Sequence, residues 1–222
     1  MKTTKNRNYG IVTGDVVGSS RLQEPVRKKL HRALGEASNA VLKAFPEDVP
    51  HPVDVFRGDS WQFVLSNPAR SLRIALFYRA ALVTAAPKGI DTRLAIAIGR
   101  VDFVPERVSE GDGVAYRLSG QQLDSLGKRH RMSFAFPGHP AEECLATIVL
   151  LLDGLVSGWT PSQARATTGA LQGWSQKQIA LECWKKPISQ QAVAQNLASG
   201  SWSYLETALE FVEKALAGTG TG

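Results

Sequence analysis

The chain has 222 residues, of which 43% are hydrophobic and 21% are charged, and its formal net charge is +6. This composition is typical of a soluble globular protein, and no apolar run approaches the roughly 20 residues that span a membrane, so we expect a cytoplasmic protein with no membrane segment. The two cysteines and four histidines are scattered, which excludes a disulfide framework and argues against a zinc site. The basic balance is compatible with a nucleic-acid or nucleotide partner.

Patterns of hydrophobic residues predict the elements from the N-terminus to residue 136. In chain order they indicate a strand, a helix, a β-hairpin, a helix, a strand, a helix and a strand, over 8–15, 24–45, 53–66, 67–85, 92–104, 113–129 and 132–136. This order is the split β-α-β pattern, in which helices cover one face of an antiparallel sheet. We therefore expect an α+β protein with a ferredoxin-like, palm-type domain.

The rest of the chain has only helical patterns. Gly138 and Pro140 interrupt the chain after the last predicted strand, and every later stretch is amphipathic and short. We place a domain boundary here, between an α+β domain over 1–138 and an all-α domain over 139–222.

Two Gly-Asp pairs lie at the ends of apolar strands, in "TGDVVGSS" and "FRGDSWQF". Because the first strand of a split β-α-β sheet lies beside the hairpin, Asp15 and Asp59 can face one another, and close carboxylates repel unless a cation lies between them. Magnesium, which binds carboxylate and phosphate oxygens, is the natural candidate. Gly14, Gly18 and Gly58 would let phosphates approach the backbone. The alternative is that both pairs are turns whose aspartates bind nearby amides.

A family resemblance rests on four stretches, "GIVTGDVVGSSRL", "VFRGDSWQFVL", "TRLAIAIGRV" and "GDGVAYRLSGQQLDSL". Together they resemble the SatD family across nearly the whole chain and, more remotely, the catalytic domain of class III nucleotidyl cyclases. The resemblance implies a palm-like domain that holds divalent cations and a nucleoside triphosphate. It implies metal binding by Asp15, Asp59 and the backbone of Val16, and phosphate binding by the segment that contains Ser19 and Ser20.

The chain departs from the cyclase pattern at the groups that would support catalysis. Val55 stands where those cyclases usually have a lysine for base recognition, and Ala115 and Ser119 stand in the places of an asparagine and an arginine. A transferring phosphoryl group needs such a cation, and Arg117 is the nearest one in sequence. We therefore expect nucleotide and magnesium binding without turnover. The alternative is an active nucleotidyl cyclase or nucleotidyltransferase with a helical dimerisation tail.

The C-terminal region contains "SQKQIALECW" followed by "ISQQAVAQNL", which predict helices near 175–183 and 189–200. The pair resembles the widespread helix-turn-helix pattern, with Ile179 and Ala180 at the helix contact and Val193 and Leu197 facing inward. The resemblance implies a surface for double-stranded DNA formed by Lys177, Lys185, Lys186, Ser189, Gln190, Gln191 and Gln195. The alternative is a helical dimerisation module that never touches DNA.

These patterns combine into one functional hypothesis. We expect a cytoplasmic DNA-binding transcriptional regulator whose cyclase-like domain binds a nucleotide with magnesium as a sensor. The final amphipathic helix is a candidate for pairing two subunits, so we expect a homodimer. A further alternative keeps DNA binding and makes the N-terminal domain a degenerate scaffold.

Overall fold

The structure is a computed structural model that describes residues 7–102 and 107–218. Its first part contains the predicted elements in the predicted order: β1 (Asn8–Val16), α1 (Glu24–Ala44), β2 (Asp54–Phe56), β3 (Ser60–Leu65), α2 (Ser71–Ala85), β4 (Thr92–Arg100), α3 (Val114–Ser125) and β5 (Met132–Ala135). Short 3₁₀ turns, η1 (Ser19–Arg21), η2 (Pro68–Arg70) and η3 (Val108–Glu110), precede the three helices. The predicted part of the fourth strand at 103–104 lies outside the described residues.

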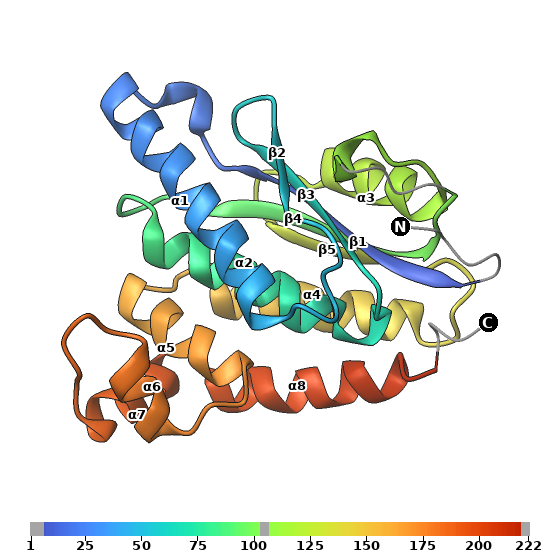
Figure 1. The fold of residues 1–222 in the computed structure, drawn as a ribbon. Coiled ribbons are helices and arrows are strands. Elements are labelled where there is room, and N and C mark those ends of the chain that lie inside the picture. Colours follow the sequence, from blue (N-terminus) through green and yellow to red (C-terminus); the bar gives the residue numbers. More distant parts are fainter. Residues whose placement is uncertain (1–6, 103–106, 219–222) are drawn as a thin grey trace.

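The five strands form one mixed sheet in the order β2-β3-β1-β4-β5. All neighbours are antiparallel except β4 and β5, which are parallel. The first four strands have the order of a split β-α-β fold, so the α+β class is confirmed. The prediction of an antiparallel sheet with helices on one face is wrong for the last strand and for the helix before it. Because β4 and β5 are parallel, the chain must cross over between them, and α3 makes this crossover on the face opposite α1 and α2 (Figure 1).

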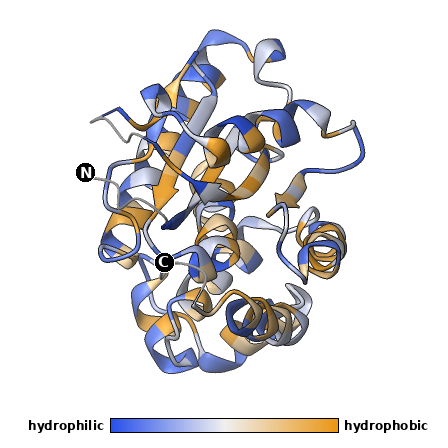
Figure 2. Cartoon of the chain, turned by 90° about the vertical axis from the view of Figure 1, so that its right-hand side faces the viewer, coloured by the Kyte–Doolittle hydropathy of each residue, from blue (hydrophilic) through white to orange (hydrophobic). Residues whose placement is uncertain are grey.

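Both faces of the sheet are therefore covered. On β1, Val12 and Val16 belong to the large core cluster with α1 and α2, whereas Tyr9 and Ile11 belong to a smaller cluster with Ala115 of α3. This alternation follows from the two-residue period of a strand. Figure 2 shows the hydrophobic residues concentrated in the strands and in the helices packed on them, with hydrophilic loops around them.

The C-terminal part consists of α4 (Glu142–Val156), α5 (Pro161–Leu171), α6 (Gln176–Glu182), α7 (Gln190–Ser199) and α8 (Trp202–Ala215). Buried residues of α4, α5 and α8 join the same core cluster as α1 and α2, while α5, α6 and α7 share a smaller cluster of their own. None of the described helices combines the length and hydrophobicity needed to cross a bilayer. The domain boundary at residue 138 stays a prediction.

The last helix uses its apolar side within the chain. Leu205, Leu209 and Val212 are fully buried in the large core cluster, and Glu213 forms an ion pair with Arg73 of α2. The apolar side of α8 is therefore not free to bind a second subunit. Homodimer formation stays a prediction.

A buried ion network joins α2, β4, β5 and α4. The guanidinium of Arg79, which has no exposed surface, donates from Nε and Nη2 to the carboxylate of Asp91 at 3.0 and 2.7 Å and from Nη1 to Asp153 at 2.9 Å. Arg131 adds a second ion pair to Asp91, and its backbone N–H donates to Asp153 at 2.7 Å. Burial alone would raise the pKa of Asp91, but the hydrogen bonds and charge of Arg79 outweigh it and lower that pKa. The network fixes the first C-terminal helix to the sheet.

Candidate functional site

The end of β1 lies beside the tip of the β2–β3 hairpin. Asp15 is opposite Ser60 in the antiparallel register, and Asp59 immediately precedes Ser60. The two aspartates thus lie at the same end of the sheet on adjacent strands. The hairpin tip contains Arg57 and Gly58 with φ of 50° and 85°, the left-handed conformation that tight hairpins need.

A pocket of about 290 Å³ lies between this hairpin tip, the turn after β1 and the start of α1. Four of the residues predicted from sequence come together in its lining: Ser19, Ser20, Gly58 and Asp59. The other lining residues are Arg27, Leu30, His31 and Arg57. The sequence contained a signal for two of these, because Arg27 and His31 are four residues apart in the basic stretch "RKKLHR" and so share one side of α1.

The pocket is positively charged and rich in hydrogen-bond donors. Arg27, His31 and Arg57 are exposed, and the charged side chains of the lining are two arginines against Asp59. Arg27 Nη2 donates to the backbone oxygen of Leu22 at 3.0 Å, which holds the guanidinium over the segment that follows β1. Such a set of guanidinium and hydroxyl groups suits a phosphate, since charge-assisted hydrogen bonds are stronger than neutral ones.

Asp59 is the acidic member of the pocket. Its carboxylate accepts a hydrogen bond from the Ser19 hydroxyl, which connects the hairpin tip to η1. The carboxylate is half-buried and borders the pocket, so one of its oxygens can accept a further partner. A cation bound there would lie beside any phosphate in the pocket.

Asp15 has a different partner. Arg93, directly opposite on β4, donates from Nε to Asp15 Oδ1 at 2.9 Å and makes a second contact from Nη2 to Oδ2. This bond raises the pKa of Arg93 and explains how a carboxylate is tolerated at the end of a buried strand. Sequence reasoning missed this pair, because it depends on the β1–β4 register.

The two carboxylates also face different sides of the sheet. Asp15 follows the alternation of Tyr9 and Ile11 toward α3, and Arg93 Nη1 reaches the backbone oxygen of Leu126 at the end of that helix, at 3.4 Å. Asp59 instead turns toward Ser19. A cation shared by both aspartates therefore requires Asp15 to exchange Arg93 for the metal, and the shared site stays a prediction.

Three further residues were predicted at this end of β1, and their surroundings differ. A Cβ on Gly14 would lie 2.2 Å from Cζ2 of Trp61, so the glycine makes room for the indole. The side chain of Val16 is buried in the core. Gly18 has a φ of 70° and open space around it, which leaves its backbone accessible. Gly18 is therefore accessible to an approaching phosphate, and the binding of a metal by the backbone of Val16 stays a prediction.

No three His, Cys, Asp or Glu side chains gather as a metal-binding group in residues 7–102 and 107–218. Magnesium commonly uses only one or two carboxylates and completes its shell with phosphate oxygens and water. Asp59 at the edge of a phosphate-sized pocket fits this pattern without a preformed cluster.

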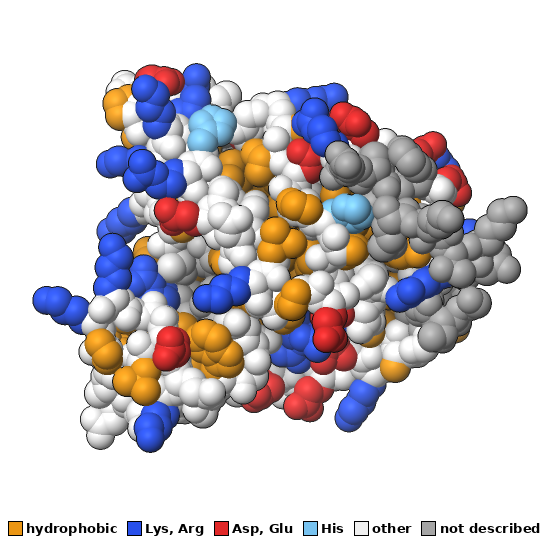
Figure 3. Space-filling model, viewed as in Figure 1, with side chains coloured by type: hydrophobic (Ala, Val, Ile, Leu, Met, Phe, Trp, Pro, Cys, Tyr) orange, Lys and Arg blue, Asp and Glu red, His pale blue; other side chains and the backbone are white. Residues whose placement is uncertain are grey.

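The second predicted surface lies on α6 and α7. Ile179, Ala180, Val193 and Leu197 are buried and pack together, as the helix-turn-helix pattern requires. Ser189 accepts a hydrogen bond from the N–H of Ala192 at 3.1 Å and so caps α7. The side chains predicted for DNA are all exposed: Lys177, Lys185, Lys186, Ser189, Gln190, Gln191 and Gln195. In Figure 3, Lys and Arg side chains gather along the edge that runs from the start of α1 toward α6 and α7.

Comparisons with known proteins give a limited result. No family model matches the chain, and no curated protein matches it. Among solved structures, it is similar to the guanylate cyclase domain of RhGC from Catenaria anguillulae in complex with GTP, at 13% identity over 59% of this chain and 79% of that one, with a TM-score of 0.45. The adenylyl cyclase CyaB from P. aeruginosa is 15% identical over 61% and 79%, with a TM-score of 0.43. At these values any functional assignment depends on the geometry of the sites, and membership of the SatD family stays a prediction.

Proposed function

We propose that the chain binds the phosphates of a nucleotide, with magnesium, in the pocket between the hairpin tip and α1. The observation that carries this proposal is the combination of Arg27, His31 and Arg57 with the hydroxyls of Ser19 and Ser20 around one acidic ligand. The arginines would neutralise the phosphates, and Asp59 would hold the magnesium that bridges to them. Asp15 would join as a second ligand only after it leaves Arg93 and turns from the α3 side of the sheet toward Asp59.

Calorimetric titration with ATP and with GTP, each with and without magnesium, tests this proposal. We expect binding that requires magnesium and that weakens about tenfold or more in Asp59→Asn, because the cation loses its ligand. The matched control is Glu206→Gln, which changes an exposed carboxylate of α8 outside the pocket. Equal affinities in the wild type and Asp59→Asn would contradict the proposal.

A second candidate function is turnover as a nucleotidyl cyclase or nucleotidyltransferase. The observation in its favour is the positive charge of Arg27 and Arg57, which could stabilise a transferring phosphoryl group. Against it, Ala115 and Ser119 of α3 are fully buried and uncharged, and Arg117 is exposed and ion-paired with Asp112. Incubation with each triphosphate and magnesium or manganese separates the two functions, since turnover would release pyrophosphate and binding alone would not.

We also propose that α6 and α7 form a helix-turn-helix that binds double-stranded DNA. The support is the buried contact between the two helices together with the exposed lysines and glutamines beside it. Glutamine can bind an adenine edge in the major groove, and each lysine would neutralise a phosphate. Selection of binding sequences from random duplexes, followed by anisotropy titrations, tests this function.

Two sets of variants sharpen the DNA experiment. Gln191→Ala should relax sequence preference, whereas Lys185→Ala with Lys186→Ala should weaken binding to all sequences and reduce the salt dependence by about two ions. Lys214→Ala is the control, because it removes an exposed charge at the C-terminal end of α8, away from α6 and α7 (Figure 1). No measurable duplex binding at low salt would leave α6 and α7 as a packing or dimerisation module.

As a regulator, the chain would couple the two activities and act as a homodimer on paired half-sites. Coupling requires that the nucleotide favours one arrangement of the two parts. Saturating nucleotide with magnesium should then change the affinity for the selected duplex, and sedimentation should show a dimer. Equal DNA affinity with and without nucleotide would contradict the sensor role.

A further inference from the structure

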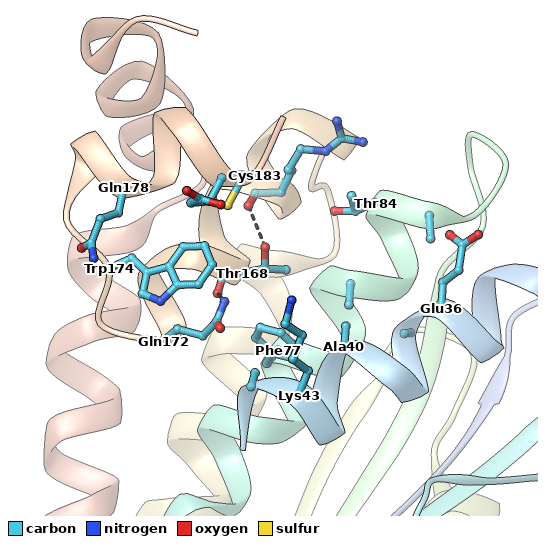
Figure 4. A pocket seen from close by; sticks show the side chains of 16 residues that line it. Glu36, Ala40, Lys43, Phe77, Thr84, Thr168, Gln172, Trp174, Gln178 and Cys183 are labelled. Carbon is cyan, nitrogen blue, oxygen red and sulfur yellow. Dashed lines mark hydrogen bonds between the residues drawn. The ribbon is translucent and has the colours of Figure 1, made fainter. Parts of the chain in front are cut away.

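A second and larger pocket lies where the N-terminal and C-terminal helices meet. Its volume is about 710 Å³, and its walls come from α1 and α2 on one side and from α5, α6 and the turn between them on the other. Figure 4 shows Phe77, Ala40 and Lys43 on the first side and Trp174, Gln172 and Gln178 on the second. This volume is within the range of sites that enclose a small organic molecule.

The inner part of the pocket is apolar. Phe77 and Ala37 are buried at its floor, Ala40 is half-buried, and the indole of Trp174 lies across from Phe77 (Figure 4). The alanines of α1 and α2 leave space that larger side chains would fill. The ring of Phe77 is buried against Phe45, so the partly exposed indole of Trp174 is the ring on which a ligand can stack. Methyl groups beside an indole favour a flat, aromatic ligand, because rings stack and bury large apolar areas.

Polar groups lie around this floor. The hydroxyl of Thr84, near the end of α2, is buried and has no hydrogen-bond partner among the described residues. A buried hydroxyl without a partner costs free energy. Because this oxygen is covered although the residue is half-buried, a ligand with a donor or acceptor would recover that cost once the Thr84 side chain rotates toward the pocket. Gln172 and Gln178 add amide groups at the opposite end (Figure 4).

The charges of this pocket balance one another. Glu36 and Glu182 line it together with Lys43 and Arg165. The pocket between the hairpin tip and α1, here called the phosphate pocket, has instead two arginines and one aspartate. A balanced lining gives no preference for an anion, so it suits a neutral or zwitterionic molecule.

We propose that this pocket is a second binding site, for a small aromatic molecule that is neutral or zwitterionic and carries hydrogen-bonding groups. The ligand stacks on the indole of Trp174, covers the methyl groups of α1 and α2, and hydrogen-bonds to the polar groups around them. The site differs from the phosphate pocket in charge and position, and it does not depend on the function proposed for that pocket.

Helix α1 lines both pockets. Leu30, near its start, borders the pocket beside Asp59. Ala37, two turns later, borders the larger pocket between α1, α2, α5 and α6. On the other wall, Gln178 belongs to α6. The aromatic ligand would therefore contact both parts of the chain at once.

The test uses three probes: indole as a neutral ring, L-tryptophan as a zwitterion and indole-3-acetate as an anion. Amide signals of the full chain are followed by NMR during titration with each probe. We expect indole and L-tryptophan to bind with Kd values on the order of 1 mM, as small fragments do, and to shift the amides of Phe77, Thr84 and Gln172. Ala40→Trp fills the pocket and should weaken binding at least tenfold, whereas Ala217→Trp places the same ring on an exposed position and should not.

The two cysteines supply an independent readout. Cys183 lines the pocket, and Cys144 is exposed on α4 outside it. Saturating indole should slow alkylation of Cys183 by iodoacetamide at least threefold and leave Cys144 unchanged. The proposal is overturned if Cys183 is not protected, if the shifted amides lie elsewhere, if Ala40→Trp binds indole as the wild type does, or if indole-3-acetate binds more tightly than indole.

Discussion

The charges around Arg79 and those around Arg57 show two different uses of arginine in one fold. Arg79 has no exposed surface, and its donors all point at Asp91, Asp153 and the Ser157 hydroxyl. Arg57 is exposed at a hairpin tip and faces an open pocket. A charge whose partners all belong to the chain stabilises the fold, whereas a charge that faces a pocket is available to a ligand. Substitution of Arg79 should therefore lower stability, and substitution of Arg57 should weaken ligand binding.

The largest expected effect is that of Arg79→Met. This change leaves the carboxylates of Asp91 and Asp153 buried with fewer partners, which typically costs 3–5 kcal/mol of unfolding free energy. Urea denaturation followed by circular dichroism measures the loss. Asp91→Asn together with Arg79→Met should be less destabilised than Arg79→Met alone, because one buried charge is removed with its partner. A loss below about 1 kcal/mol would mean that the network contributes little.

The same network predicts a loss of stability in acid. Because the pKa of Asp91 is lower in the folded chain than in the unfolded one, its contribution is present above the unfolded pKa of about 4 and is lost as the pH falls through the folded pKa. One additional proton bound on unfolding gives a slope of about 1.4 kcal/mol per pH unit. The stability difference between the wild type and Asp91→Asn should therefore shrink between pH 5 and pH 3. A difference that does not change with pH would contradict the lowered pKa.

Arg57→Gln should affect binding without affecting the fold. Its side chain is exposed, so we expect a change in unfolding free energy within about 0.5 kcal/mol. The affinity for a magnesium triphosphate should fall about tenfold, which is about 1.4 kcal/mol, because a charge-assisted contact to phosphate is lost. Arg129→Gln, at an exposed position before β5, is the matched control and should change neither quantity. If Arg57→Gln and Arg129→Gln have the same affinity, the pocket does not hold the phosphates.

Arg93 is intermediate between the buried Arg79 and the exposed Arg57. In its ion pair with Asp15, 33% of the Arg93 side chain and 22% of the Asp15 side chain are exposed, and Arg93→Gln removes this pair. Removing the guanidinium leaves Asp15 free to bind a cation, so magnesium affinity in the presence of nucleotide should rise by about two- to fivefold, equivalent to at most about 1 kcal/mol. Isothermal titration with magnesium at fixed nucleotide measures this. Unchanged or weaker magnesium binding would leave Asp15 with a purely structural role.

Local patterns in the sequence were sufficient to predict the elements and their order. Alternation and helical spacing predicted the strands and helices, and Gly58, Asp59 and Ser60 between two short strands predicted the hairpin. The parallel pairing of β5 was not predicted, although a strand, a helix and a strand in succession over 92–136 are typical of a parallel crossover. The prediction extended the antiparallel pattern of the first four strands to the fifth.

The candidate site was predictable only in part, for a similar reason. Asp59, Ser19 and Ser20 lie in short motifs, so sequence could point to them. The partner of Asp15 is a residue 78 positions away, chosen by the register of two strands. The use of Gly14 as space for Trp61 also depends on a cross-strand neighbour. Tertiary contacts of this kind decide which polar residues are already satisfied and which remain free for a ligand.

One NMR experiment can locate the metal and the phosphates together. Manganese can replace magnesium and broadens the NMR signals of nearby amides, so a small amount of Mn²⁺ with ATP is added to the labelled chain. The account predicts that the amides of Ser19, Gly58 and Asp59 broaden first and that Asp59→Asn removes this effect. Broadening centred elsewhere, or equal broadening in Asp59→Asn, would contradict it.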